Sequence, residues 1–343
     1  MISIATPTMW AVFTLFVILA LLVDLLVLKA NGPHKVSTKE ALIWSMAWIA
    51  LAFIFNAGLW WYLKDSGSPD ADRIGMEFLT GYLVEKALAV DNIFVFLMIF
   101  TYFAVPAPSQ QRVLIYGVLG AIVLRAIMIF IGAALIQQFH WILYFFGLFL
   151  LATGAKMLWA AGKEPDMEKN PILRWITGHL PLTRHYHGES FIVREDGIKK
   201  YTPLFVVMMM VAFTDVIFAV DSIPAIFAIT TDPFIVLTSN VFAVLGLRAL
   251  YFLLAGMAEK FHLLAYGLAM VLMFIGVKLI LTYLHETWTE IPKISTVGSL
   301  AVIGLILFVS TVASFIKVKK DPTAHAHAGR VTSGKNPDGT HQG

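Results

Sequence analysis

Cysteine is absent from this 343-residue sequence, and charged residues are scarce, at 14% of the chain. Without thiols the chain can form neither disulfides nor thiolate metal sites, so any metal ligand must be an oxygen or an imidazole nitrogen. A soluble domain carries about a quarter charged residues. Here 59% of the residues are hydrophobic and the mean hydropathy is +0.79. The composition therefore indicates a membrane protein.

The first apolar run, residues 8–28, has no basic residue before it, whereas Lys29, Lys35 and Lys39 follow it. A secretory signal peptide has its basic region first. The pattern therefore predicts a retained membrane span with its N-terminus outside the cell.

Nine apolar stretches are long enough for transmembrane helices, which need about 20 residues each. The sequence predicts an all-α, polytopic bundle of about nine spans within a transport domain at 1–320, a polar loop at 162–202, and a polar, disordered cytoplasmic tail at 321–343. The predicted spans are residues 8–28, 41–63, 75–104, 112–136, 140–161, 203–230, 233–257, 261–284 and 295–317.

Basic residues gather after the first span, in the long loop and after the last span. With nine spans these three segments share one side, and loops rich in lysine and arginine are cytoplasmic. The C-terminus is therefore expected in the cytoplasm. Within the long loop, residues 170–178 are compatible with a short amphipathic helix at the interface, and Asp196-Gly197 between two β-prone runs is a hairpin signal. An ordered cytoplasmic cap is the preferred interpretation of this loop.

Two parts of the sequence repeat one another. Glu85-Lys-Ala-Leu-Ala-Val-Asp91-Asn92 aligns with Asp215-Val-Ile-Phe-Ala-Val-Asp221-Ser222. A unit of three spans enters the membrane from opposite sides in its two copies, about 75–161 and 203–284, so the sequence predicts an inverted three-plus-three repeat, a plan common among secondary transporters. Further pairs match in the same order: Leu124-Arg125-Ala126 with Leu247-Arg248-Ala249, Phe139-His140 with Phe261-His262, and Gly154-Ala-Lys156 with Gly276-Val-Lys278.

The repeated motif places four carboxylates inside predicted spans, where an unpaired ionised group costs several kcal/mol. Helix positions i and i+7 share a face, whereas i and i+6 lie about 120° apart. Either the helices unwind at the motif, or the second acid of each copy faces a different neighbour. Pro224 favours unwinding in the second copy because it removes a donor and frees the carbonyl of Val220.

A metal site is the first interpretation of these acids. Four acids and the two deep arginines, Arg125 and Arg248, sum to −2, which a divalent cation would neutralise, and oxygen ligands suit hard ions such as Mn²⁺, Mg²⁺ or Ca²⁺. The alternative is a closed ion-pair network that only holds the bundle together. Lys86 could also form an ion pair with Glu85 alone. Asp24 in the first span is an extra ligand, a proton carrier or the partner of a lysine. The candidate metal ligands are Glu85, Asp91, Asn92, Asp215, Asp221 and Ser222, with Arg125, Arg248 and Asp24 as charge partners.

The stretches EKALAVDNIFVF, DVIFAVDSIPAIFAITTDPFIVLTSN, YGVLGAIVLRAIMIF and LGLRALYFLLAG closely resemble the TerC family of bacterial integral membrane proteins, over roughly residues 8–318. The resemblance implies an inner-membrane Mn²⁺ exporter with Glu85, Asp91, Asp215 and Asp221 as its acidic motif residues. It also links the chain to metalation of exported proteins and, by the family's name, to tellurium resistance.

The function expected from the sequence is export of a divalent cation, Mn²⁺ as substrate, in exchange for protons, because a divalent ion displaces the protons that crowded carboxylates hold. A membrane-assembly or metalation scaffold that partners the protein-export machinery is the alternative. An enzyme, a permanently bound cofactor and a nucleic-acid partner are not expected, since no catalytic constellation or cofactor fingerprint is present.

Overall fold

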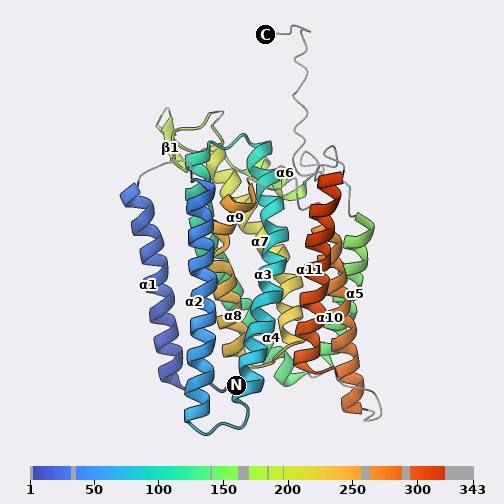
Figure 1. Ribbon diagram of the computed structural model, residues 1–343. Coiled ribbons are helices and arrows are strands. Elements are labelled where there is room, and N and C mark those ends of the chain that lie inside the picture. The colour runs from blue at the N-terminus through green and yellow to red at the C-terminus, as the bar shows by residue number, and fades with distance from the viewer. Residues whose placement is uncertain are drawn as a thin grey trace.

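The computed structural model describes residues 3–31, 36–139, 141–160, 170–183, 185–195, 197–255, 263–287 and 294–320. These residues form a bundle of long helices with a small hairpin at one end, which confirms the predicted helical membrane class (Figure 1). The helices are α1 (Pro7–Asn31), α2 (Thr38–Asp65), α3 (Ala71–Tyr102), α4 (Ala107–Gln138), α5 (Ile142–Ala160), α6 (Pro171–His179), α7 (Pro203–Phe227), α8 (Pro233–Leu245), α9 (Leu247–Ala255), α10 (Leu264–Thr287) and α11 (Thr296–Lys320), and the strands are β1 (Ile192–Glu195) and β2 (Ile198–Tyr201).

Seven of the described helices are long and apolar enough to cross a membrane, and the bent pair α8 and α9 raises that number to eight. α3 has 32 residues, but its central part carries Glu85, Lys86 and Asp91. Figure 1 shows α3 running between the same two ends of the bundle as its neighbours. The predicted total of nine spans is therefore reached only with α3, whose charges set it apart from the other helices.

The three basic segments of the sequence lie at one end of the bundle. Figure 1 shows α6, the hairpin and the end of α11 at the end where α1 finishes and α2 begins. This arrangement is the one that the loop charges require, and the assignment of that end to the cytoplasm stays a prediction. His140, His262, the residues of the loop at 161–169 and the tail from 321 lie outside the described residues.

The two elements predicted for the long loop are both present. Asn170 caps α6 by accepting hydrogen bonds from the backbone N–H groups of Ile172 (2.9 Å) and Leu173 (3.3 Å), as N-cap side chains do. β1 and β2 pair antiparallel from Ile192–Tyr201 to Glu195–Ile198. The hairpin prediction is therefore confirmed.

The predicted span 233–257 is not one continuous helix. α8 and α9 meet at Gly246 with a bend of 41°. The Lys86 ammonium donates a hydrogen bond to the carbonyl of Ala243 at 3.1 Å, and a Cβ on Gly246 would lie only 2.7 Å from its Nζ. A positive charge at the C-terminal end of a helix stabilises the unpaired carbonyls there. Lys86 therefore caps the break and is not the partner of Glu85.

Helix α7 is continuous through Pro224, so the prediction that this helix unwinds there is wrong. The proline lies inside the helix, in its last turn before Phe227. A proline removes one hydrogen bond and crowds one carbonyl, and near a helix end few further bonds remain to be lost. The motif acids of both copies therefore sit on regular helix.

Helices α5 and α10 make reciprocal contacts. A Cβ on Gly276 would lie 2.8 Å from the carbonyl oxygen of Gly147 and 3.0 Å from Leu151, and a Cβ on Gly154 would lie 2.9 Å from the carbonyl oxygen of Ala269. In the alignment of the copies Gly147 matches Ala269 and Gly154 matches Gly276, so each contact is the image of the other. An inverted repeat would produce this exchange, and for the whole three-helix unit the repeat stays a prediction.

Candidate functional site

Arg125 on α4 lies at the centre of a buried charge cluster. Its guanidinium donates two hydrogen bonds to the Asp215 carboxylate on α7, from Nε at 3.1 Å and from Nη2 at 3.0 Å. Nη1 forms an ion pair with Glu85 on α3 and lies 3.5 Å from the Ser222 hydroxyl. The three charged residues are each at most 3% exposed. We call Arg125, Glu85 and Asp215 the arginine cluster.

The arginine cluster joins three helices through one guanidinium. The guanidinium is planar and carries several N–H donors, so it can bind two carboxylates at once better than a lysine ammonium can. The closed ion-pair network weighed from the sequence is therefore what the structure shows for these two acids. Two carboxylates and one arginine leave the cluster with a formal charge of −1, so the ion pairs do not neutralise it.

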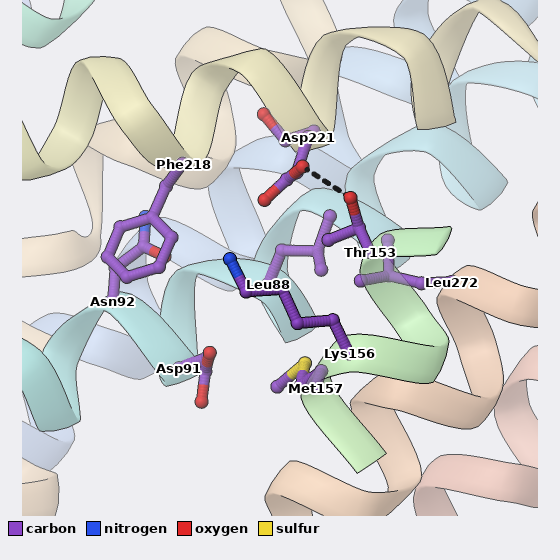
Figure 2. Close-up of a pocket in the computed structure, with 10 residues that line it drawn as sticks. Leu88, Asp91, Asn92, Thr153, Lys156, Met157, Phe218, Asp221 and Leu272 are labelled. Atoms are coloured by element: carbon purple, nitrogen blue, oxygen red, sulfur yellow. Dashed lines mark hydrogen bonds between the residues drawn. The ribbon is translucent and has the colours of Figure 1, made fainter. Parts of the chain in front are cut away.

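The second acids of the two motifs, Asp91 and Asp221, face a different space. They line a cavity of about 220 Å³ that also receives Asn92 and Ser222 from the same helices. Figure 2 shows Asp91 from α3 and Asp221 from α7 on opposite sides of this space. We call it the acidic cavity. Its other lining residues are Leu88, Thr153, Lys156, Met157, Phe218 and Leu272.

Helix α5 supplies two polar residues of the acidic cavity that the sequence analysis did not select. Thr153 donates a hydrogen bond from Oγ1 to the Asp221 carboxylate at 3.2 Å. Lys156 acts electrostatically on Asp221 and reaches into the cavity in Figure 2. The two residues are three positions apart on one helix face. A signal existed in the sequence, because Lys156 belongs to the matched Gly-x-Lys element.

The single six-residue metal site predicted from the sequence is not formed. No group of three or more acidic, histidine or cysteine side chains that could hold a metal occurs among the described residues. The reason is geometric: on regular helix, residues six apart point about 120° away from each other. Glu85 and Asp215 therefore meet Arg125, while Asp91 and Asp221 enter the acidic cavity. Of the alternatives weighed from the sequence, different neighbours for the two acids is the correct one.

Asp24 and Arg248 form a separate pair away from both groups. Arg248 Nη2 contacts the Asp24 carboxylate, with side chains 12% and 13% exposed. Asp24 therefore has an arginine partner and not a lysine near the membrane surface. At the other end of α1, Asp232 accepts hydrogen bonds from Ile4 N at 2.6 Å and Ser3 Oγ at 3.1 Å. These contacts fasten α1 to the broken helix α8–α9.

The acidic cavity has the volume and the chemistry to hold a small hydrated cation. A volume of about 220 Å³ has room for an ion together with several waters. Its polar lining is carboxylate, amide and hydroxyl oxygen, the ligand set that hard divalent cations prefer. Two carboxylates from two different helices could approach one ion, with Asn92 and Ser222 beside them.

Comparison with known proteins places this architecture in a family. Residues 71–321 match the Integral membrane protein TerC family. The chain belongs to the TerC family. It is 51% identical over 320 residues to the "Putative membrane-bound redox modulator Alx" of Escherichia coli (strain K12), covering 93% of this chain and 98% of that protein.

Two further relatives show how far the likeness extends. The protein of the same name from Salmonella typhi is 50% identical over 325 residues, covering 94% of this chain and 99% of that protein. The "Uncharacterized membrane protein STKORF319" of Myxococcus xanthus is 46% identical over 329 residues, covering 96% and 98%. No solved structure matches the chain. The resemblance found in the motifs therefore holds across almost the whole length of this multi-pass membrane protein.

Proposed function

We propose that this TerC family protein is a secondary transporter that exports a divalent metal cation, with Mn²⁺ as its substrate, across the bacterial inner membrane. The main support for this proposal is the acidic cavity. Asp91 and Asp221, from separate helices, both line this one cavity, which is large enough to hold water molecules. Ionisable residues inside a membrane protein are costly and mark ion pathways more often than not.

The charges around the cavity favour a divalent ion. The arginine cluster has a formal charge of −1, and Asp91, Asp221 and Lys156 together also sum to −1. Both groups meet at Ser222, which lines the cavity and lies 3.5 Å from Arg125 Nη1. A combined charge of −2 attracts a doubly charged cation. The absence of thiols in the chain favours a hard ion over a soft one.

We propose further that export is coupled to protons. The membrane potential, negative inside, opposes export of a divalent cation by roughly 4.6 kcal/mol per 100 mV. Two carboxylates that share one cavity can hold a proton when the ion has left, and the arriving ion releases that proton. Alternating exposure of the cavity to the two sides would then exchange the cation for protons.

Transport assays in proteoliposomes test this proposal. The purified protein is reconstituted and uptake is followed for a panel of divalent ions, with internal pH recorded during an imposed pH step. We expect Mn²⁺ flux with counter-movement of protons, and loss of flux to the protein-free level in Asp91→Asn and Asp221→Asn. The matched control is Glu77→Gln, because Glu77 is on α3 but pairs with Arg73 outside the cavity, at 2.6 Å.

The outcomes separate the two functions considered for this chain. Full flux in both variants would contradict a role of the cavity in transport. Absence of flux in the wild type would favour the assembly or metalation scaffold, whose action does not need the carboxylates. The redox activity in the name of the Alx relatives, if this chain shares it, cannot use its own thiols, because the sequence has no cysteine.

A further inference from the structure

Lys156 is the one cationic side chain among the residues that line the acidic cavity. It lies on α5, four residues before that helix ends at Ala160. A lysine near the end of a span ordinarily extends its ammonium to the membrane surface. Figure 2 shows the opposite direction: the Lys156 side chain reaches back into the space between Asp91 and Asp221. Lys156 is an exposed residue, yet its side chain is directed toward the two acids and not away from them.

The contacts of Lys156 are those of a loosely held charge. Its ammonium acts electrostatically on Asp221, yet among the described residues no carboxylate lies within 4.0 Å of it in an ion pair. Asp221 takes its hydrogen bond from Thr153 instead, at 3.2 Å. A lysine has a flexible stem and a compact charge, so its ammonium can leave the cavity at little cost. This contrasts with Arg125, which is held by two carboxylates.

We propose that Lys156 is a tethered counter-cation that occupies the acidic cavity when the metal ion is absent and leaves it when the ion binds. The inference rests on the proposed transport function and adds a residue that controls affinity and release. In the empty state the ammonium reduces the repulsion between Asp91 and Asp221. When the ion arrives, like charges repel and the flexible side chain swings out. Its return helps to expel the ion, so the carboxylates are never left without a cation.

The proposal predicts a split between binding and turnover. Removing a positive charge that lines the cavity should strengthen Mn²⁺ binding roughly tenfold, because the ion no longer competes with the ammonium. The same change should slow release, so the maximal transport rate falls although the affinity rises. A lysine that only supported the fold would not produce this opposite pair of effects.

The lack of cysteine permits a direct experiment, since Lys156→Cys introduces the single thiol of the chain. Mn²⁺ binding to protein in lipid nanodiscs is measured by loss of the free-ion EPR signal, before and after modification with methanethiosulfonate reagents. The unmodified variant should bind roughly ten times more tightly than the wild type. An aminoethyl reagent, which rebuilds a positive side chain, should restore wild-type affinity, and a neutral methyl reagent should not.

Two controls make the outcomes decisive. Lys199→Cys, at an exposed position of the hairpin strand β2, should bind Mn²⁺ as the wild type does under every reagent. Lys156→Arg, measured if the cysteine variant does not fold, should keep wild-type or weaker affinity. Wild-type protein that binds no divalent cation would overturn the proposed function. Wild-type protein that binds Mn²⁺ while the charge at position 156 has no effect would overturn the counter-cation alone.

Discussion

Arg125 and Arg248 occupy matched positions in the two copies of the repeat, but their surroundings differ. Arg125 is 2% exposed and binds one carboxylate from each copy. Among the residues that the structure describes, Arg248 pairs only with Asp24, which lies on α1 outside the repeat. The difference begins in the backbone: α4 is continuous through Arg125, whereas the α8–α9 bend at Gly246 comes two residues before Arg248.

This asymmetry decides where negative charge remains. The pair of Arg248 and Asp24 is neutral, whereas the arginine cluster keeps a formal charge of −1 beside the acidic cavity. If both arginines lay among the four motif acids, their positive charges would neutralise more of the negative charge there. The attraction for a cation would then be weaker. Because Arg248 pairs with Asp24 on α1, the interior of the bundle keeps a net negative charge, which favours cation binding.

The largest expected effect is at Arg125. Arg125→Met leaves Glu85 and Asp215 buried without a counter-charge, a change that costs about 3–5 kcal/mol of unfolding free energy. Arg248→Met removes a partner from one carboxylate only, and its loss should be clearly smaller. Thermal unfolding in detergent, followed by tryptophan fluorescence, compares the two variants.

A rescue experiment separates charge from packing at Arg125. Adding Glu85→Gln and Asp215→Asn to Arg125→Met removes the unpaired charges, and replacing a whole buried ion network by neutral groups is often nearly neutral for stability. We expect the triple variant to regain most of the lost melting temperature. If Arg125→Met and Arg248→Met lowered the melting temperature equally, or if the triple variant did not regain stability, the proposed difference between the two copies would be contradicted.

A smaller effect is expected at the α5–α10 contact, where the copies are most alike. In Gly276→Ala the new Cβ would meet backbone atoms, the Gly147 carbonyl oxygen at 2.8 Å and Leu151 N at 3.0 Å. Overpacking of this kind costs about 1–3 kcal/mol. Gly147→Ala should cost less than Gly276→Ala, because its new Cβ would lie 2.7 Å from the Ile280 side chain but 3.1 Å from the nearest backbone atom, the Gly276 carbonyl oxygen, and because the matched residue, Ala269, is already alanine. Chemical denaturation of the two variants measures the difference, and the reverse order would contradict the reciprocal packing.

The sequence predicts more of the fold than of the site. Hydropathy predicts most of the long helices and the Asp196-Gly197 turn signal predicts the hairpin, because these depend on local composition. The grouping of the acids depends on helix direction and on long-range partners: Arg125 donates hydrogen bonds to two acids that lie 40 and 90 residues away in the sequence. The break at Gly246 could not be predicted either, since Lys86, which caps it, is 157 residues from Ala243.

A modest effect is expected for the pair on α1. Asp24→Asn leaves Arg248 without its carboxylate, but both side chains are partly exposed, so the loss of unfolding free energy should be about 1 kcal/mol. Neither residue lines the acidic cavity. Mn²⁺ affinity should therefore be unchanged, and exchange of the charges in Asp24→Arg with Arg248→Asp should recover the stability. Loss of Mn²⁺ binding in Asp24→Asn would instead make Asp24 part of the ion site.

The smallest effect is expected at the exposed end of the molecule, where charges are solvated. Lys200 lowers the pKa of Glu195, mainly by its hydrogen bond at 2.9 Å and also by its charge. A lowered pKa in the folded state means that this contact stabilises the hairpin above the ordinary carboxyl pKa and is lost as pH falls through the lowered value. The protection of the β1 and β2 amides, measured as the exchange rate relative to the intrinsic rate at each pH, should therefore fall slightly on acidification to about pH 3. Glu195→Gln should remove most of this pH dependence without altering transport, since the pair joins two strands outside the helical bundle. A pH response of the hairpin that persists in the variant would show that other groups control it, and a change in Mn²⁺ flux would show that the hairpin and the acidic cavity are coupled.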